Sequence, residues 1–131
     1  MVRYHVFRIP PGEEVVSHIS RYCRENAIKS GLVLGIIGSL SHAEIAYLRS
    51  LPGDYFKVAY EGPLEIVCAM GNVGTEKDTE ECIVHIHAVV SNSNTAVGGH
   101  FATGTVFATA GVSLLEFEGE CEIVRELDPT T

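Results

Sequence analysis

The sequence has 131 residues, of which 46% are hydrophobic, and a net charge of −8 from 17 acidic and 9 basic residues. This length fits one domain with a single core, and the acidic surplus repels nucleic-acid phosphates, so direct DNA binding is not expected. No apolar run approaches the roughly 18 residues of a membrane-spanning helix, and the amino terminus lacks a signal-peptide pattern, so we predict a cytoplasmic protein that does not associate with membranes.

The first two predicted elements are a strand and a helix. In residues 3–9, "RYHVFRI", Tyr4 and Val6 alternate with His5, Phe7 and Ile9, which is typical of a strand. Residues 10–31 change period, with acidic residues at their start and a glycine at their end. Apolar side chains recur there at spacings of three and four, which predicts one amphipathic helix packed on a sheet: Val15, Val16, Ile19, Tyr22, Cys23, Ala27 and Ile28.

From residue 31 onward the pattern is that of strands. Segments rich in branched and aromatic residues are separated by Gly, Asn and Ser clusters. They cover residues 31–41, 43–50, 54–62, 63–74, 81–90, 104–119 and 120–127. One main helix with about eight or nine strands predicts an α+β fold. The sheet should be mostly antiparallel, because parallel crossovers would require more helices.

The four cysteines give no motif. Cys23, Cys68, Cys82 and Cys121 lie far apart in the sequence and none forms a Cys-x-x-Cys pair. A zinc ribbon or a local redox dithiol is therefore not predicted. We expect reduced and mostly buried thiols.

Three histidines occur within residues 82–101, "CIVHIHAVVSNSNTAVGGHF". Residues two apart in a strand point to the same face, about 6.5 to 7 Å apart at Cα. His85 and His87 therefore share one face, while the apolar row Val84, Ile86, Ala88 and Val90 faces the core. Two imidazoles on one face can converge on a single ion, but two ligands alone make a weak site.

His100 supplies a third candidate ligand. The turn-forming segment "SNSNTAVGG" can reverse the chain, so that the strand with His100 returns antiparallel beside the other two histidines. Gly98 and Gly99 have no side chains to block this approach. Three histidines with an open position favour zinc first, with nickel, copper or iron as other candidates. The alternative interpretation is a half-exposed polar strand face followed by an ordinary glycine turn.

Three blocks together resemble the plants-and-prokaryotes-conserved (PPC) domain family: "GIIGSLSHAEIAY", "YEGPLEIVCAMGNVG" and "HIHAVVSNSNTAVGGHFATGTVFATA". The resemblance covers roughly residues 3 to 126, and its most specific part is the His-x-His block with the Gly-Gly-His that follows. It implies a single PPC-like domain over 1–131, of the type that stands alone in prokaryotes. It also implies a homotrimer, and the high hydrophobic content gives softer support for burial between subunits.

The sequence departs from the family pattern in two places. It contains no Arg-Gly-Arg-Pro AT-hook, the element that accompanies the domain in plant nuclear proteins, so DNA binding does not transfer. Gly111 stands where many prokaryotic relatives are expected to have Glu, which puts any role of that carboxylate in doubt here.

Two function classes follow from these patterns. The first is a metal-binding module for binding or assembly, in which zinc or another divalent transition metal is held by His85, His87 and His100 and is either structural or the site of a small-molecule ligand. The alternative is a small metal-dependent enzyme that uses a water bound to the same ion as nucleophile. A DNA-associated regulatory role ranks below both. The sequence identifies no catalytic residue.

Overall fold

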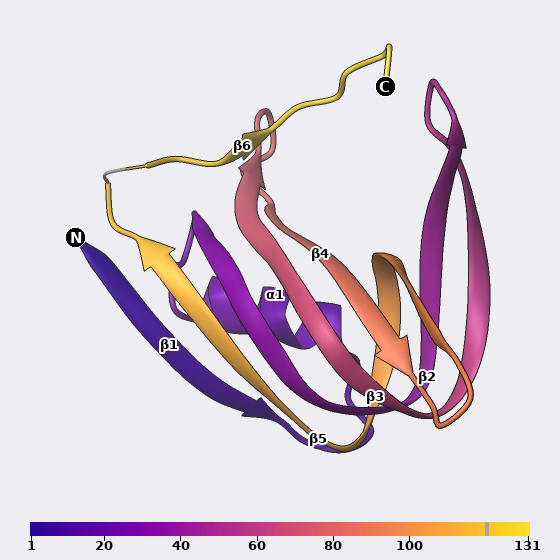
Figure 1. Cartoon of the computed structure of the whole chain (residues 1–131). Coiled ribbons are helices and arrows are strands. Elements are labelled where there is room, and N and C mark those ends of the chain that lie inside the picture. Colours follow the sequence, from indigo (N-terminus) through magenta and orange to yellow (C-terminus); the bar gives the residue numbers. More distant parts are fainter. Residues whose placement is uncertain (120) are drawn as a thin grey trace.

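The computed structural model describes residues 1–119 and 121–131. In these residues the chain forms one helix and six strands (Figure 1). In chain order they are β1 (Val2–Ile9), α1 (Val15–Glu25), β2 (Gly31–Ser50), β3 (Asp54–Glu76), β4 (Cys82–Ser91), β5 (Ala96–Phe117) and β6 (Val124–Arg125). The predicted α+β class with one main helix is thus confirmed.

The predicted number of strands, eight or nine, is wrong. Residues 31–41 and 43–50 form one continuous strand, β2, and residues 54–62 and 63–74 form β3. The breaks that the sequence suggested are irregularities within pairing, such as the register shift between Leu40 and His42. A bulge bends a strand without ending it. The last predicted strand shortens to the two residues of β6, and residue 120 of that segment lies outside the described residues.

The strands pair in the order β1-β5-β2-β3-β4, and the start of β5 also pairs with β4. All of these pairs are antiparallel, as predicted, and only the short β6 pairs in parallel, with β3. Because β5 contacts both β2 and β4, the sheet curls and closes on itself. This closure brings β4 and the first residues of β5 together, and both carry predicted metal ligands.

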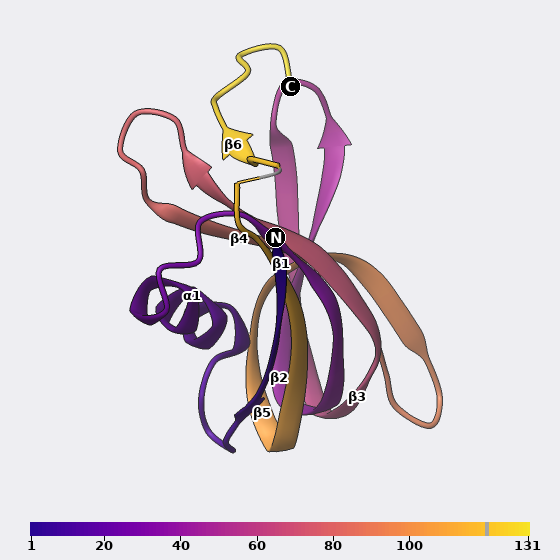
Figure 2. The same cartoon turned by 90° about the vertical axis from the view of Figure 1, so that its left-hand side faces the viewer.

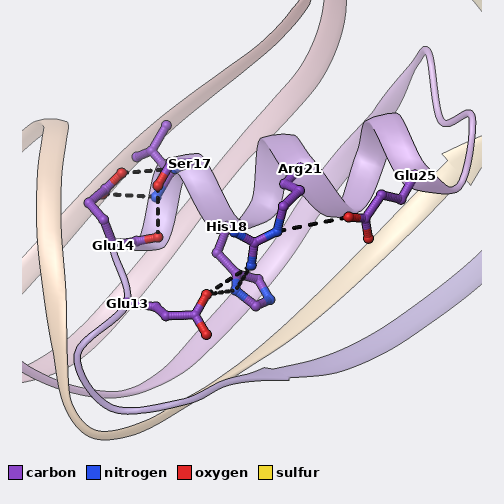
Figure 3. A network of polar contacts seen from close by, with 7 residues as sticks. Glu13, Glu14, Ser17, His18, Arg21 and Glu25 are labelled. Atoms are coloured by element: carbon purple, nitrogen blue, oxygen red, sulfur yellow. Dashed lines mark hydrogen bonds and ion pairs between the residues drawn. The ribbon is translucent and has the colours of Figure 1, made fainter.

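Helix α1 lies on one side of the strands (Figure 2). Its start is fixed by Glu14, whose carboxylate accepts hydrogen bonds from the N–H groups of Val16 (2.9 Å) and Ser17 (2.8 Å) (Figure 3). The helix ends at Glu25, earlier than the apolar pattern suggested. Ala27 follows it in a left-handed conformation with φ 55°, and it is exposed.

The core lies between the helix and the sheet. Helix α1 contributes Val15, Ile19 and Cys23, and the even-numbered residues of β4 from Ile86 to Val90 are buried as the alternation predicted. Cys82 and Val84, on the same face of β4, are partly buried against this core. Among residues 1–119 and 121–131, no helix has the length and apolar character required to cross a membrane.

Candidate metal centre

Strand pairing brings the three predicted ligands together. His87 in β4 lies directly opposite His100 in β5, and His85 lies two residues before His87 on the same face. The ring centroids are 5.1 Å apart for His85 and His87, 4.9 Å for His85 and His100, and 5.7 Å for His87 and His100. One nitrogen of each ring lies within 4.8 Å of the other two. The cluster is partly exposed, with His87 the most accessible.

The turn between β4 and β5 forms as its composition predicted. The Asn92 side chain accepts hydrogen bonds from the N–H groups of Asn94 (2.8 Å) and Thr95 (3.0 Å). The two glycines that follow, Gly98 and Gly99, allow β5 to pack closely against its neighbouring strands. They do not serve to open a path to an ion, as the sequence had suggested. A Cβ on Gly98 would lie 2.9 Å from Val89 Cγ2, and one on Gly99 would lie 3.0 Å from a methyl group of Ile45 in β2. Small residues at these positions therefore hold β5 close to both neighbours.

A guanidinium group contacts the cluster. Nη2 of Arg125, in β6, lies 2.6 Å from Nδ1 of His85 and donates a second hydrogen bond of 2.7 Å to the side-chain oxygen of Asn72. The buried Nε of Arg125 has no hydrogen-bond partner in the described part of the chain. An unpaired buried donor on a cation is costly, so this Nε is a position where an anionic acceptor would bind favourably.

Two of the three histidines, His85 and His100, favour their neutral form. Burial lowers the pKa of His85 to about 4, with further contributions from the positive charge of Arg125 and from the neighbouring His100 and His87. Burial also lowers the pKa of His100, followed by the effects of His87, Arg125 and Lys57. Neutral imidazoles keep the lone pairs that metal binding requires.

The Arg125 contact determines which nitrogen of His85 carries the proton. A guanidinium only donates hydrogen bonds, so Nδ1 of His85 accepts and the proton of the neutral ring lies on Nε2. A metal bound at Nδ1 would displace Arg125. A metal bound at Nε2 would move the proton to Nδ1, where it would face the guanidinium. Metal binding by His85 and its hydrogen bond from Arg125 are therefore mutually exclusive.

Small residues leave space beside the histidines. Ala46 in β2 pairs with His100 on one side and with Lys57 of β3 on the other, so the three lie in a row across the sheet. A cavity of about 470 Å³ opens there. It is lined by Ala46, Tyr55, Lys57, His85, His100 and Ala102.

A second cavity, of about 300 Å³, lies on the other side of the cluster. It is lined by Met70, Gly71, Asn72, His85 and His87. Within residues 1–119 and 121–131, neither lining includes an acidic side chain. The charged groups near the histidines are therefore basic, namely Lys57 and Arg125.

The geometry of the three imidazoles fits a transition-metal ion. Two nitrogens at 2.0 to 2.1 Å from a tetrahedral zinc are about 3.3 Å apart. The present separations, within 4.8 Å, exceed this value by an amount that rotation of the partly exposed rings can remove. Three neutral nitrogen ligands would leave at least one coordination position for water or another ligand.

The other sequence predictions have mixed outcomes. His5, His18 and His42 lie outside the cluster, as expected, and pair with Glu116, Glu13 and Glu61 respectively. The expectation that the cysteines are mostly buried is wrong for Cys68 and Cys121, which are exposed because they lie outside the core-facing rows.

Gly111 does not contribute to the cluster. It pairs with Arg8 and Ile37, far along β5 from the pairing of His100 with His87. A Cβ at this position would lie 3.9 Å from the carbonyl oxygen of Ile37, so the backbone there leaves room for a side chain.

Sequence reasoning missed the basic and amide groups around the histidines. Arg125 and Asn72 contact the site from β6 and β3, and Lys57 reaches its cavity from the far end of β3. No local spacing connects these residues with the histidines. The signal that could have found them is the pairing of β3 with β4 and β6, which only the fold reveals.

Comparison with known families identifies one that matches most of the chain. The model of the Plants and Prokaryotes Conserved (PCC) domain matches residues 1–118. A plant- and prokaryote-conserved protein from Pyrococcus horikoshii is similar in structure, with 31% identity, a TM-score of 0.87, and 96% of this chain and 85% of that chain covered. A protein from Archaeoglobus fulgidus, described as metal-containing, has 27% identity and a TM-score of 0.87, with 96% and 86% covered.

A curated relative is much longer than this chain. The "Bifunctional protein GlmU" of Synechococcus sp. strain JA-3-3Ab is 28% identical over 131 residues, which are 99% of this chain and 20% of that protein. The chain thus spans about a fifth of the length of the curated relatives it matches.

Proposed function

This chain belongs to the Plants and Prokaryotes Conserved (PCC) domain family, and from that premise we propose that it is a metal-binding module whose zinc-class ion is held by His85, His87 and His100. The observation that carries the proposal is the convergence of three imidazoles from two paired strands. The similar protein from Archaeoglobus fulgidus that is described as metal-containing adds support.

The ion would receive a small anionic ligand. A divalent metal among neutral imidazoles, with Lys57 and Arg125 nearby, creates a surplus of positive charge. The unpaired Nε of Arg125 offers a further donor to such a ligand. A carboxylate is a suitable class, because it can accept two parallel hydrogen bonds from one guanidinium while an oxygen reaches the metal. Movement of Arg125 onto the ligand would also free His85 for the metal, so metal and anion would bind cooperatively.

An enzyme that activates a metal-bound water is the second candidate. The open coordination position favours it, since a zinc-bound water has its pKa lowered toward about 7. The charge around the cluster opposes it, because no acidic side chain of residues 1–119 or 121–131 lines either cavity to serve as general base. We therefore rank the module first.

Self-association is part of the proposal. Several large apolar side chains are well exposed on the sheet, among them Tyr4 (73%), Val6 (80%) and Ile37 (82%). Strand β1 is also an edge strand, and proteins usually cover such edges. Burial of this surface in a homotrimer accounts for both features. Light scattering coupled to size exclusion at micromolar concentration tests it, and a mass near the 14.2 kDa of one chain would reject self-association.

Metal content is the direct test of the module. Protein purified without an affinity tag, incubated with zinc and then desalted, should retain about one equivalent per chain, and His100→Ala should retain far less. Less than about a tenth of an equivalent in the wild type would exclude the site. Hydrolysis of esters and phosphates, assayed with and without chelator, distinguishes the enzyme. Turnover that depends on metal would favour the second candidate.

A further inference from the structure

The two faces of β4 carry different chemistry. The face under α1 has a thiol at its first residue, and a second thiol lies nearby in the helix. Cys82 is the first residue of β4, and Cys23 lies in α1, which packs against that strand. Both sulfurs are free thiols. The two cysteines line a common cavity of about 550 Å³, together with Arg24, Ala27, Ile28, Lys29, Thr75, Glu80 and Glu81.

Polar groups of α1 stabilise negative charge on the Cys82 sulfur. The thiol of Cys23 and the hydroxyl of Ser20 lie beside it and favour its ionised form. Nη1 of Arg24 in turn donates a 2.7 Å hydrogen bond to the oxygen of Ser20, which polarises that hydroxyl. The neighbouring Cys23 thiol, then Ser20 and the charge of Arg24, lower the pKa of Cys82 to about 6 against the opposing effect of burial.

The remaining charges near the pair act in both directions. Lys29 lines the cavity and favours a thiolate, whereas Glu80 and Glu81 line it and disfavour one. The neighbouring Cys82 and burial raise the pKa of Cys23, and the charge of Glu116 adds to this. Because Cys23 is fully buried and Cys82 is only partly buried, the negative charge of the pair is favoured on Cys82.

Access differs between the two sulfurs. Cys23 is 0% exposed, whereas Cys82 is only partly buried at the edge of the cavity. A dissolved reagent therefore meets Cys82 before Cys23. This arrangement matches redox-sensitive pairs, in which an accessible low-pKa thiol lies next to a resolving thiol.

We propose that Cys82 is a site of reaction with peroxides and that it then forms a reversible disulfide with Cys23, which ties α1 to β4. Neither cysteine belongs to the histidine cluster. The inference therefore stands whether or not the protein binds a metal.

The chemistry balances in two steps. The Cys82 thiolate attacks one oxygen of hydrogen peroxide, the O–O bond breaks, and a sulfenic acid and hydroxide form. The Cys23 sulfur then attacks the Cys82 sulfur as its proton leaves, the S–S bond forms, and the S–O bond breaks to release water. In total two thiols lose two electrons and one peroxide becomes two waters. A dithiol reductant reverses the reaction.

Alkylation provides the first test, with the exposed Cys68 and Cys121 as internal comparisons in the same molecule. At pH 6 a thiol of pKa about 6 is half ionised, and an ordinary thiol of pKa about 8.5 is ionised to about 0.3%. The weaker nucleophilicity of the less basic sulfur reduces this advantage to about tenfold. Iodoacetamide labelling, followed by peptide mass spectrometry, should therefore modify Cys82 first at pH 6. Slower labelling of Cys82 than of both comparisons would overturn the proposal.

Peroxide treatment provides the second test. Mass spectrometry without reduction should find the Cys23–Cys82 linkage, and dithiothreitol should remove it. Cys68→Ser should not alter this result. Cys23→Ala keeps an apolar side chain in the core but removes the second thiol. Oxidation of Cys82 should then stop at the sulfenic acid, which dimedone traps. A linkage that pairs other cysteines instead, or no linkage in folded wild-type protein, would contradict the proposal.

The contribution of Arg24 can be measured separately. Arg24→Gln removes the charge and weakens the polarisation of Ser20, so alkylation of Cys82 at pH 6 should slow about threefold. Arg21→Gln, on the same helix but paired with Glu13 (2.8 Å), is the matched control and should leave the rate unchanged. Equal rates in both variants would show that Arg24 does not activate the thiol. Loss of folding is excluded by comparing their far-ultraviolet circular dichroism.

Discussion

Strand β4 presents two candidate sites on opposite faces, and they differ in how they are built. On one face, His85 and His87 join His100 from the neighbouring strand. On the other face, Cys82 meets Cys23 from a helix almost sixty residues earlier in the chain. The first site is assembled by adjacent strands joined by a tight turn, and the second depends on tertiary packing. Local patterns therefore identify the histidines but cannot identify the thiols.

The face of β4 that carries Cys82 is part of the core, whereas the histidine face is partly exposed. Truncations on the two faces should therefore lower the free energy of unfolding by different amounts. Ile86 is 1% exposed and packs under α1. Truncation of such a side chain leaves a cavity, so Ile86→Ala should lower the free energy of unfolding by about 3 kcal/mol. Val89 lies on the histidine face and is 37% exposed, so Val89→Ala should cost less than about 1 kcal/mol. Urea denaturation compares them, and equal losses would show that β4 lacks this division.

The histidine face should lose its metal when one ligand is removed, while the thiol face remains unchanged. We expect His87→Ala to weaken zinc binding about a hundredfold or more, because two imidazoles form a much poorer site than three. Alkylation of Cys82 should proceed at the wild-type rate in this variant. Calorimetric zinc titration measures the first effect. His42→Ala is the control, since His42 lies outside the cluster and faces Glu61. A similar loss in both variants would indicate a non-specific effect.

In the proposed site, Arg125 separates metal binding from anion binding. Its hydrogen bond to His85 (2.6 Å) competes with a metal, and its charge repels one. Arg125→Met should therefore tighten zinc binding about tenfold in the absence of anions. It should also abolish any enhancement of zinc affinity by acetate. Lys77→Met removes a charge from an exposed loop residue and serves as control. Unchanged affinity in Arg125→Met would show that the guanidinium does not oppose the metal.

The smallest effect concerns the pH dependence of stability and comes from His85 on the histidine face. The folded metal-free protein keeps His85 neutral down to pH about 4, whereas the unfolded chain protonates it near pH 6.5. The unfolded state therefore binds more protons in this window, so stability falls as pH decreases from about 6.5 to 4. With solvent screening of this partly exposed group, the contribution is of order 1 kcal/mol. His85→Asn should lose less stability between pH 7 and 4.5, and an identical loss would refute the assignment.

The sequence predicted the fold class, the helix face and the histidine face correctly, for reasons that lie in local spacing. His85 and His87 alternate with a buried row, and the Asn-rich turn sets the antiparallel return that places His100 opposite His87. The count of strands failed because Ser41 in β2 and Gly62–Pro63 in β3 lie at an irregularity within two paired strands that continue. The contacts of Arg125 and Lys57 could not be predicted, since each depends on which strands become neighbours.

Zinc could bind on either face of β4, because imidazoles and thiolates are both good ligands for it. X-ray absorption at the zinc edge of protein loaded with one equivalent therefore tests the central claim most directly. We predict three imidazole nitrogens at about 2.0 to 2.1 Å with one or more further light atoms, and loss of this signal in His100→Ala. Sulfur neighbours at about 2.3 Å would place the ion at Cys82 and Cys23 and contradict the assignment of the metal centre to the histidines.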